Sequence, residues 1–309
     1  MEYYGFSQYL KERFGTKVYK VALHAGLTCP NRDGTLGTGG CIFCSADGSG
    51  DFAEQAAFSV SCQIQKAKER VKHKNPNGVY IAYFQAFTNT YGPIDYLERI
   101  FSEAMEEEDV VAISIATRPD CLSDDVLALL KRLNKRKPVW VELGLQTIHE
   151  KSAVYIRRGY ETPVFDEAVK KLRAIGIEQI IVHVILGLPG EDKSMMLQTV
   201  DYVGHSGASG IKLQLLHVLK HTDLAKEYQA GKFEVLTQDE YITLVTECIA
   251  ILPEHMVIHR MTGDGSRKNL IAPMWSTDKK KVLNQLHQAI SNADRAALRK
   301  KFAQGTADA

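Results

Sequence analysis

The apolar positions along the chain fall into short, β-branched runs that alternate with longer amphipathic segments. Six runs have the length and composition of strands: Val18–Ala25, Val79–Gln85, Val110–Thr117, Val139–Leu145, Ile180–Gly187 and Ile211–His217. Helical periodicity marks the segments between and after them: Tyr96–Met105, Asp124–Leu133, Val164–Ile175, Ser194–Val203 and Thr222–Ala230. Alternation of this kind is typical of βαβ units around a parallel sheet. It predicts an α/β fold, either doubly wound or an open, partial (βα)6 barrel.

Polar residues on one face of three predicted strands favour the barrel. Because side chains alternate along a strand, three sets each share a face: Trp140, Glu142, Gly144 and Gln146; Ile181, His183 and Ile185; Lys212 and Gln214. A parallel sheet covered on both faces is almost wholly apolar, so we expect a lumen that holds a polar ligand. We expect Lys212 at a strand end in water. Glu142, between two apolar neighbours, is expected to be buried and functional.

The spacing of these elements predicts three regions. Residues 1–17 form an N-terminal extension, residues 18–235 the barrel, and residues 236–309 a C-terminal, helical extension that closes the barrel and contacts substrate. The connection between the first two strands is twice the usual length. It follows the carboxyl end of the first strand, where barrels of this kind carry out chemistry.

Three cysteines in that connection indicate a metal centre. Eleven residues separate Cys29 from Cys41, and two separate Cys41 from Cys44. Three thiolates suit a [4Fe–4S] cluster with one iron left open for a ligand. The alternative is zinc, with His24 or His73 as the fourth ligand.

Other readings of the thiols are weaker. A thioredoxin-like dithiol needs no third cysteine upstream of its pair. The remaining thiols, Cys62, Cys121 and Cys248, are scattered, and we expect them to be structural. The interpretation of the region from residue 28 to residue 50 is therefore a cluster-binding loop.

Composition and charge further limit the classes of protein to which the chain can belong. The 309 residues are 45% hydrophobic and 24% charged, with a formal net charge of +1, as in an ordinary globular protein. No apolar run approaches ~20 residues and the first 20 residues lack a signal-peptide core, so we expect a cytoplasmic chain with no membrane partner. Lys and Arg concentrate in residues 66–74, 131–137 and 279–301. Such segments fit a polyanion, although each can also serve as a solvated helix face.

Further motifs follow later strands in a fixed order. They read TRPD at Thr117–Asp120, ELGLQT at Glu142–Thr147 and LGLPGE at Leu186–Glu191. Together with the cysteine loop, they resemble the radical S-adenosylmethionine (SAM) superfamily, in the branch that contains the elongator catalytic subunit. The resemblance runs from about Val18 to Ile290.

Four longer strings resemble one bacterial family more closely. They are TCPNRDG at Thr28–Gly34, FQAFTNTY at Phe84–Tyr91, LLHVLKHT at Leu215–Thr222 and HRMTGDGSR at His259–Arg267. They are similar to the MnmL-type tRNA wobble-uridine modification family. The resemblance implies conversion of a carboxymethylaminomethyl group at uridine C5 to aminomethyl. It also implies a tRNA partner and a small reducing protein such as flavodoxin or ferredoxin.

The same resemblance implies a cofactor set and its contacts. A [4Fe–4S] cluster on Cys29, Cys41 and Cys44 would reductively cleave SAM to give a radical that abstracts hydrogen from the substrate. The superfamily's Gly-Gly-Glu motif, which holds the SAM amino group, is replaced here by residues 85–90. Glu142 would bind the ribose, and Arg158, or its neighbour Arg157, the carboxylate. The candidate SAM contacts are Gln85, Thr88, Asn89, Thr117, Glu142, Gln146, Arg158 and Leu186, the last at the start of the Gly187–Gly190 turn.

The sequence motifs leave more than one class of substrate possible. His259, Arg260, Asp264 and Arg267 are expected in a charged loop that receives a substrate phosphate or carboxylate, or in a turn that closes the barrel. Two alternatives to a tRNA-modifying enzyme stand. One is the same chemistry on a small molecule, as in porphyrinogen oxidation. The other is a zinc-stabilised RNA-binding module without catalysis.

Overall fold

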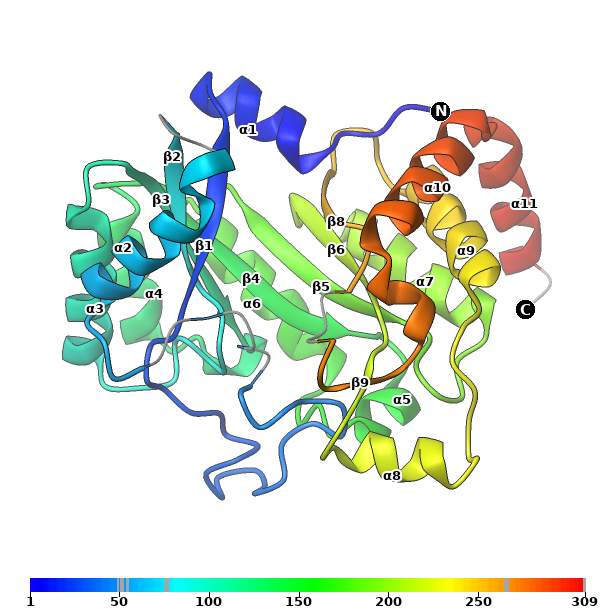
Figure 1. Ribbon diagram of the computed structural model, residues 1–309, viewed down its shortest axis with the longest axis horizontal. Coiled ribbons are helices and arrows are strands. Elements are labelled where there is room, and N and C mark those ends of the chain that lie inside the picture. The colour runs from blue at the N-terminus through cyan, green and yellow to red at the C-terminus, as the bar shows by residue number, and fades with distance from the viewer. Residues whose placement is uncertain (49, 51–52, 54–55, 75–77, 264–266, 308–309) are drawn as a thin grey trace.

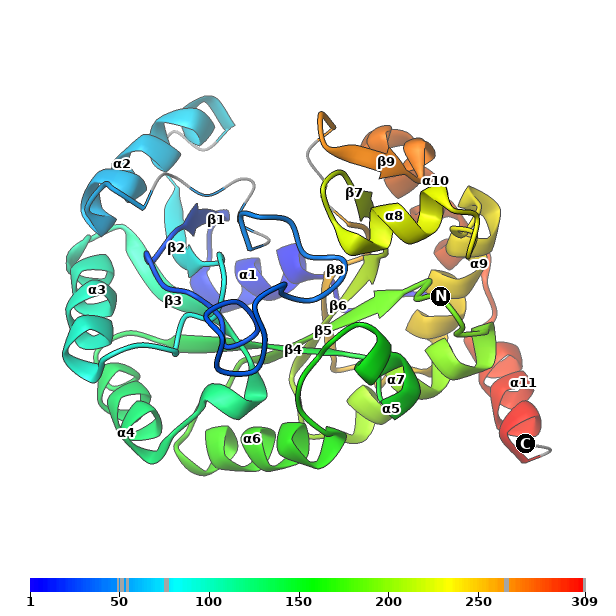
Figure 2. The same ribbon diagram turned by 90° about the horizontal axis from the view of Figure 1, so that it is seen from below.

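A curled parallel sheet organises the molecule. The computed structural model describes residues 1–307 apart from 49, 51–52, 54–55, 75–77 and 264–266. In this part of the chain seven parallel strands lie in the order β1-β2-β3-β4-β5-β6-β8 and form an incomplete barrel (Figures 1 and 2). Their bounds are β1 Val18–Leu23, β2 Val79–Phe84, β3 Val110–Thr117, β4 Val139–Gln146, β5 Ile180–Leu186, β6 Gly210–Leu215 and β8 Val257–Arg260. A short antiparallel ribbon pairs β7 (Val218–Leu219) with β9 (Leu270–Ala272).

Most of the helices surround the outer face of the sheet, whereas α1 lies across one end of the barrel (Figures 1 and 2). In the described part of the chain the helices are α1 Phe6–Phe14, α2 Val60–Val71, α3 Ile94–Glu106, α4 Asp124–Leu133, α5 Glu150–Tyr155, α6 Thr162–Ala174, α7 Lys193–His205, α8 Asp223–Gln229, α9 Gln238–Ile251, α10 Lys279–Asn292 and α11 Arg295–Ala307, with 3-10 turns η1 Lys72–Lys74, η2 Pro119–Cys121 and η3 Met274–Thr277. Side-chain caps fix several starts: Ser123 accepts from the Val126 amide, and Thr237 and Glu240 form a capping box.

The core lies between the helices and the outward-facing strand residues. Fully buried side chains such as Phe84, Phe101 and Phe165 fill it. A separate cluster closes the amino ends of the strands, where α1 lies across the barrel (Figure 1). There Trp140 packs edge-on against Phe6 and Tyr9. The lumen is therefore plugged at its amino end and open at its carboxyl end.

The barrel also stays open along one side. β1 and β8 are the two edges of the seven-stranded sheet. The C-terminal helices pack on the β8 side, where α9 contacts α7, α10 and α11. No helix among the described residues is both long enough and apolar enough to cross a membrane.

The expected partial barrel is confirmed, with two corrections. The sequence missed β8 and expected His259 and Arg260 in a loop, but both belong to this strand, which pairs with β6. Lys212 does not lie in water, since it is only 4% exposed. Asp264 lies outside the described residues.

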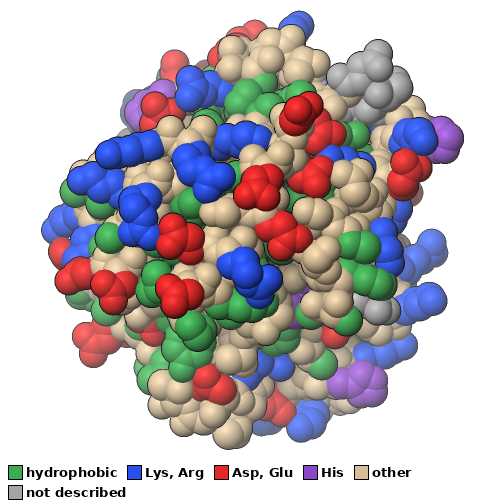
Figure 3. Space-filling view, turned by 90° about the vertical axis from the view of Figure 1, so that its left-hand side faces the viewer, with side chains coloured by type: hydrophobic (Ala, Val, Ile, Leu, Met, Phe, Trp, Pro, Cys, Tyr) green, Lys and Arg blue, Asp and Glu red, His purple; other side chains and the backbone are tan. Residues whose placement is uncertain are grey.

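The basic segments occupy different edges of the barrel. Residues 72–74 come before β2 and residues 131–137 before β4, so both lie toward the amino edge, away from the cysteine loop that follows β1. On the face that α2, α3 and α4 cover, acidic side chains are interspersed with basic ones (Figure 3), and Lys68 contacts both Glu107 and Asp109. Lys279–Lys281 instead begin α10, beside the open side of the barrel.

Candidate functional site

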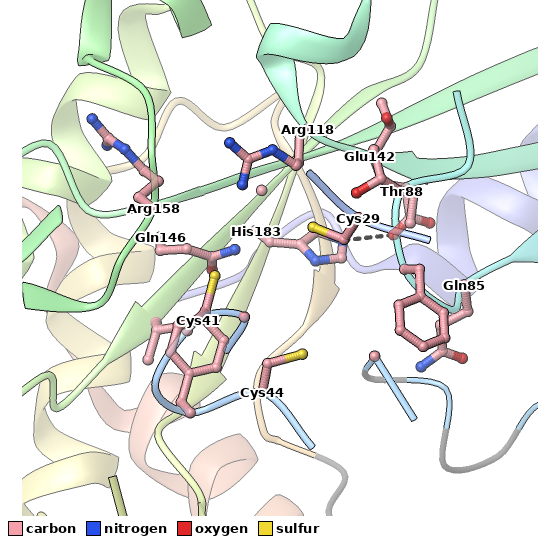
Figure 4. Close-up of a pocket in the computed structure, with 18 of the residues that line it drawn as sticks. Cys29, Cys41, Cys44, Gln85, Thr88, Arg118, Glu142, Gln146, Arg158 and His183 are labelled. Carbon is pink, nitrogen blue, oxygen red and sulfur yellow. Dashed lines mark hydrogen bonds and ion pairs between the residues drawn. The ribbon is translucent and has the colours of Figure 1, made fainter. Parts of the chain in front are cut away.

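The cysteine loop lies over the carboxyl ends of the strands (Figure 2). Cys29, Cys41 and Cys44 line one cavity, and their sulfur atoms point into a common space (Figure 4). Cys44 follows Cys41 in a turn closed by a hydrogen bond from the Cys44 amide to the Cys41 carbonyl, 3.0 Å long. The loop thus brings the three predicted ligands together.

Two side chains hold the loop in this shape. Asn31 donates its amide to the Cys41 sulfur at 3.5 Å and to the carbonyl of Arg157 at 2.6 Å. Arg32 donates to the Ser45 carbonyl at 2.6 Å. Gly40 is required beside it, because its φ is +71° and an added Cβ would stand 3.0 Å from the Arg32 guanidinium. An amide that donates to a ligand sulfur is the type of contact that tunes a metal–thiolate site.

Most of the predicted SAM contacts line the same cavity. They are Gln85, Thr88, Thr117, Glu142, Gln146 and Arg158. Gln146 is the best placed of these to accept a hydrogen bond from a ligand, because its Oε1 is buried without a hydrogen-bond partner and its φ is +68°. A buried unsatisfied acceptor and a strained backbone are both costly, and they concentrate at functional sites.

Two predicted contacts lie elsewhere. Asn89 is fully buried, and its amide donates to the backbone carbonyls of Phe84 and Ala116. Leu186 belongs to the main hydrophobic core. Neither side chain is among the described residues that line the cysteine cavity.

Two arginines beside the cavity differ in what they contact. Arg158 is 2% exposed and donates to the carbonyls of Thr147 at 2.6 Å and Tyr160 at 2.9 Å, so much of its guanidinium is engaged by the backbone. Arg118, from the TRPD motif, forms a two-point pair with Asp120, at 2.9 and 2.7 Å. Arg118 was not predicted as a site residue, although its motif was recognised.

A belt of polar side chains crosses the lumen below the cysteines. Glu142 stands at its centre and is 1% exposed. Its Oε1 lies 2.5 Å from the Lys20 ammonium and accepts from Ser114 at 2.7 Å. Its Oε2 contacts Lys212 and lies 2.6 Å from Nε2 of His183. The expected burial of Glu142 is present, and its charged partners are two lysines.

This belt shifts the ionisation of its members. Burial opposes the charge on Glu142, but Lys20, Lys212 and His183 outweigh it and hold the pKa of that carboxyl well below its usual range. Burial lowers the pKa of Lys212 to about 7, although Glu142 acts in the opposite direction. Burial and the nearby Lys212 lower the pKa of His183 to about 4. His183 is therefore neutral at pH 7.

The residues proposed for a zinc site are not brought together. Among the described residues, neither His24 nor His73 lines the cysteine cavity. His24 accepts from the Gly26 amide at 2.9 Å, and His73 lies in η1 before β2. No three described His, Cys, Asp or Glu side chains group as ligands of a single ion. Three thiolates around an open space suit the separate irons of a cluster better than one zinc.

Sequence reasoning missed several members of the polar belt. Lys20, Tyr83, Ser114 and Arg260 join the belt from β1, β2, β3 and β8. A polar residue in an otherwise apolar strand was the available signal for Lys20 and Ser114. The charge of Arg260 was noted, but its strand was not recognised.

The fold and this site define a radical SAM enzyme. The chain belongs to the radical SAM superfamily: the superfamily model matches residues 33–203, and the Radical_SAM C-terminal domain matches residues 208–292. Enzymes of this class use a [4Fe–4S] cluster and SAM. Because the chain belongs to this superfamily of enzymes, the alternative of a zinc-stabilised RNA-binding module without catalysis is wrong.

Particular relatives lie close in sequence. The chain is 48% identical over 302 residues to the uncharacterized protein YtqA of Bacillus subtilis, covering 98% of this chain and 93% of that one. It is 36% identical over 271 residues to protein YhcC of Escherichia coli, covering 87% and 86%. It is 24% identical over 161 residues to the tRNA uridine(34) acetyltransferase of Methanocaldococcus jannaschii, covering 51% of this chain and 29% of that protein.

Solved structures share the fold. Elp3 of Methanocaldococcus infernus aligns with a TM-score of 0.64 at 18% identity, over 85% of this chain and 63% of the other. The coproporphyrinogen III oxidase HemN of Escherichia coli aligns with a TM-score of 0.52 at 16% identity, over 81% and 56%. The chain thus shares the radical SAM fold with both structures.

Proposed function

We propose that this radical SAM enzyme modifies tRNA at the C5 side chain of the wobble uridine, converting carboxymethylaminomethyl to aminomethyl. The similarity to a tRNA uridine(34) acetyltransferase and to Elp3 supports an RNA substrate. The observation that carries the proposal is an opening in the side of the barrel, beside the cysteine cavity, that is lined by Lys20, Lys212 and Lys279 and that an exposed base can approach. An anticodon loop offers such bases outside a duplex.

The residues would divide the work as follows. Cys29, Cys41 and Cys44 would hold the cluster, whose bound SAM supplies a hydrogen-abstracting radical. Gln146, with its unsatisfied Oε1, is suited to receive a donor from SAM. Glu142 would accept from the ribose hydroxyls in exchange for one of its present contacts. The Gln85 and Thr88 side chains replace the usual Gly-Gly-Glu at the methionine amine.

Only one of the three basic segments would contact the RNA. Lys279, Lys280 and Lys281 are exposed at the start of α10, and Lys279 lines the opening. Residues 66–74 and 131–137 face the amino edge, so we assign them no contact with the substrate. A flavodoxin or ferredoxin would supply the electron, as the resemblance implies.

Two measurements test the proposal. Mass spectrometry of tRNA nucleosides from a deletion strain should show 5-carboxymethylaminomethyluridine accumulating at the expense of 5-aminomethyluridine and nucleosides derived from it. Anaerobically reconstituted protein with SAM and a reductant should restore the conversion in vitro. An unchanged nucleoside profile would contradict the tRNA substrate and favour the small-molecule alternative, which is supported by the fold shared with HemN.

A further inference from the structure

A second cavity opens from the side of the barrel, between the two sheet edges. α1 and α10 border it, and its volume is about 730 Å³, ample for a nucleoside. Lys20, Lys212 and Arg260 line its inner wall, and Lys279 and His287 line its outer part. Among the described residues that line it there is no Asp or Glu.

This lateral cavity adjoins the cysteine cavity. Tyr83, Gln85, Lys212 and Arg260 line both. A ligand group in the lateral cavity therefore lies next to the space that the three cysteines face. The two cavities are the two halves of one lumen, with the polar belt between them.

Charge in the belt is not balanced. Two ammonium groups, of Lys20 and Lys212, contact a single carboxylate, that of Glu142. No second carboxylate contacts either lysine within the described part of the chain. Lys212 is 4% exposed, and the lowered pKa of its amine reflects its burial and the cost of a second positive charge beside Lys20. An anionic ligand next to the two lysines would offset that cost and favour the protonated amine.

We propose that the lateral cavity binds the substrate through a carboxylate, received by Lys20 and Lys212. In the proposed function, on which this inference rests, that carboxylate is the end of the carboxymethylaminomethyl side chain. The geometry suits this group, because the Glu142 carboxylate already accepts from both lysines. If Glu142 turns toward the ribose of SAM, both ammonium groups become available to the substrate.

A backbone phosphate fits the belt less well. Lys212 lies inside the lumen, near the middle of β6, and an RNA phosphate is flanked by nucleotides on both sides. A base with a terminal carboxylate can instead extend a single thin chain into the recess. Phosphates are better placed at the exposed lysines of α10, outside the cavity.

The test compares three anticodon stem-loops that differ only at the wobble position: 5-carboxymethylaminomethyluridine, 5-aminomethyluridine and uridine. The reconstituted holoenzyme should bind the first about tenfold or more tightly than the other two, the effect of a charge-assisted contact. Lys212→Gln should abolish that preference and leave binding of the other two unchanged. Lys72→Gln, an exposed lysine at the amino edge, is the matched control and should keep the preference. Lys20→Gln, which removes the other ammonium group that the proposal assigns to the carboxylate, is the second variant in case Lys212→Gln does not fold, and it should abolish the preference as well.

Each result has a separate meaning. Equal binding of the three stem-loops by the wild type would overturn the carboxylate site, whether or not tRNA is converted. Equal weakening of all three by Lys212→Gln would show a phosphate contact and overturn it as well. The free nucleoside 5-carboxymethylaminomethyluridine provides a further arm. If it binds in a Lys212-dependent way but no stem-loop binds, the carboxylate site stands and the RNA substrate is contradicted.

Discussion

The ammonium of Lys20 on β1 lies 2.5 Å from a carboxylate oxygen of Glu142 on β4, across the lumen. In the sheet β2 and β3 lie between these two strands, and 122 positions separate the two residues along the chain. The contact joins the open edge of the barrel to its middle strand. Glu142 lines the cysteine cavity and Lys20 lines the lateral cavity, so this ion pair lies where the two cavities meet.

The first prediction concerns the cluster ligands. Changing Cys29, Cys41 or Cys44 to Ala should remove most of the iron and abolish 5′-deoxyadenosine formation, because each thiolate would hold a different iron. Iron content and absorption near ~400 nm measure the effect. Cys121→Ala is the control, because this thiol lies near Cys29 but is not assigned to the cluster. Burial and the neighbouring Asp120 raise its pKa to about 12, which disfavours the thiolate that a metal needs. Retention of full activity in Cys44→Ala would refute the assignment.

The second prediction concerns Glu142 and SAM. Glu142→Gln should keep its iron but weaken SAM binding by about 1–3 kcal/mol, the decrease expected for charge-assisted hydrogen bonds to the ribose. Equilibrium binding of SAM to the reconstituted protein measures it. Ser114→Ala removes a neighbour's hydrogen bond to Glu142 without removing the carboxylate, and should have a smaller effect. An unchanged SAM dissociation constant in Glu142→Gln would rule out the ribose contact.

The third prediction follows from the lowered pKa of Lys212. Its folded value of about 7 lies below the ordinary 10.5, so the unfolded chain binds more protons between these limits. Lys212 should therefore make the protein more stable as pH rises from 7 toward 10, by about 1.4 kcal/mol per pH unit. Denaturant unfolding of the wild type and of Lys212→Met at several pH values isolates this contribution as their difference. A difference that stays flat with pH would show that Lys212 titrates normally.

The fourth prediction separates structure from cofactor binding at Arg158. Its contacts with two backbone carbonyls and Glu150 are mostly buried, so Arg158→Ala should lower the free energy of unfolding by about 3 kcal/mol. Arg132→Ala, which removes an exposed pair with Glu98, should change it by less than about 1 kcal/mol. A stable Arg158→Ala protein that has lost only SAM affinity would instead assign this residue to the cofactor.

The fifth prediction concerns RNA. Replacing Lys279, Lys280 and Lys281 together by Gln should weaken tRNA binding and reduce its salt slope by about one for each phosphate that is no longer neutralised. SAM cleavage without substrate should persist. The control removes the same number of charges at the amino edge, by changing the exposed Lys72, Lys74 and Lys135 to Gln. This triple variant should bind tRNA with unchanged affinity. Equal effects of the two triple variants would mean that the RNA binds without regard to the open side of the barrel.

Local patterns in the sequence determined much of this protein. Alternation along strands and helical periodicity predicted six of the seven strands of the sheet and the helices α3, α4, α6, α7 and α8, because both patterns depend on neighbouring residues, whereas α2 and α5 were not predicted. The spacing of Cys29, Cys41 and Cys44 identified the loop for the same reason. The polar face of β4 marked Glu142 and Gln146. The sequence did not predict β8, because this strand is only four residues long and carries His259 and Arg260, which give it no apolar pattern.

Tertiary structure alone decided which charges meet. Lys212 looked like a solvated strand end, and Lys20 was not noticed, because nothing local to either residue indicates a carboxylate 70 or 122 positions away. The curl of the sheet brings both to Glu142. It also sends residues 66–74 and 131–137 to the amino edge, since each basic segment directly precedes a strand. Sequence periodicity tells which face a side chain occupies, whereas closure of the sheet determines what lies opposite it.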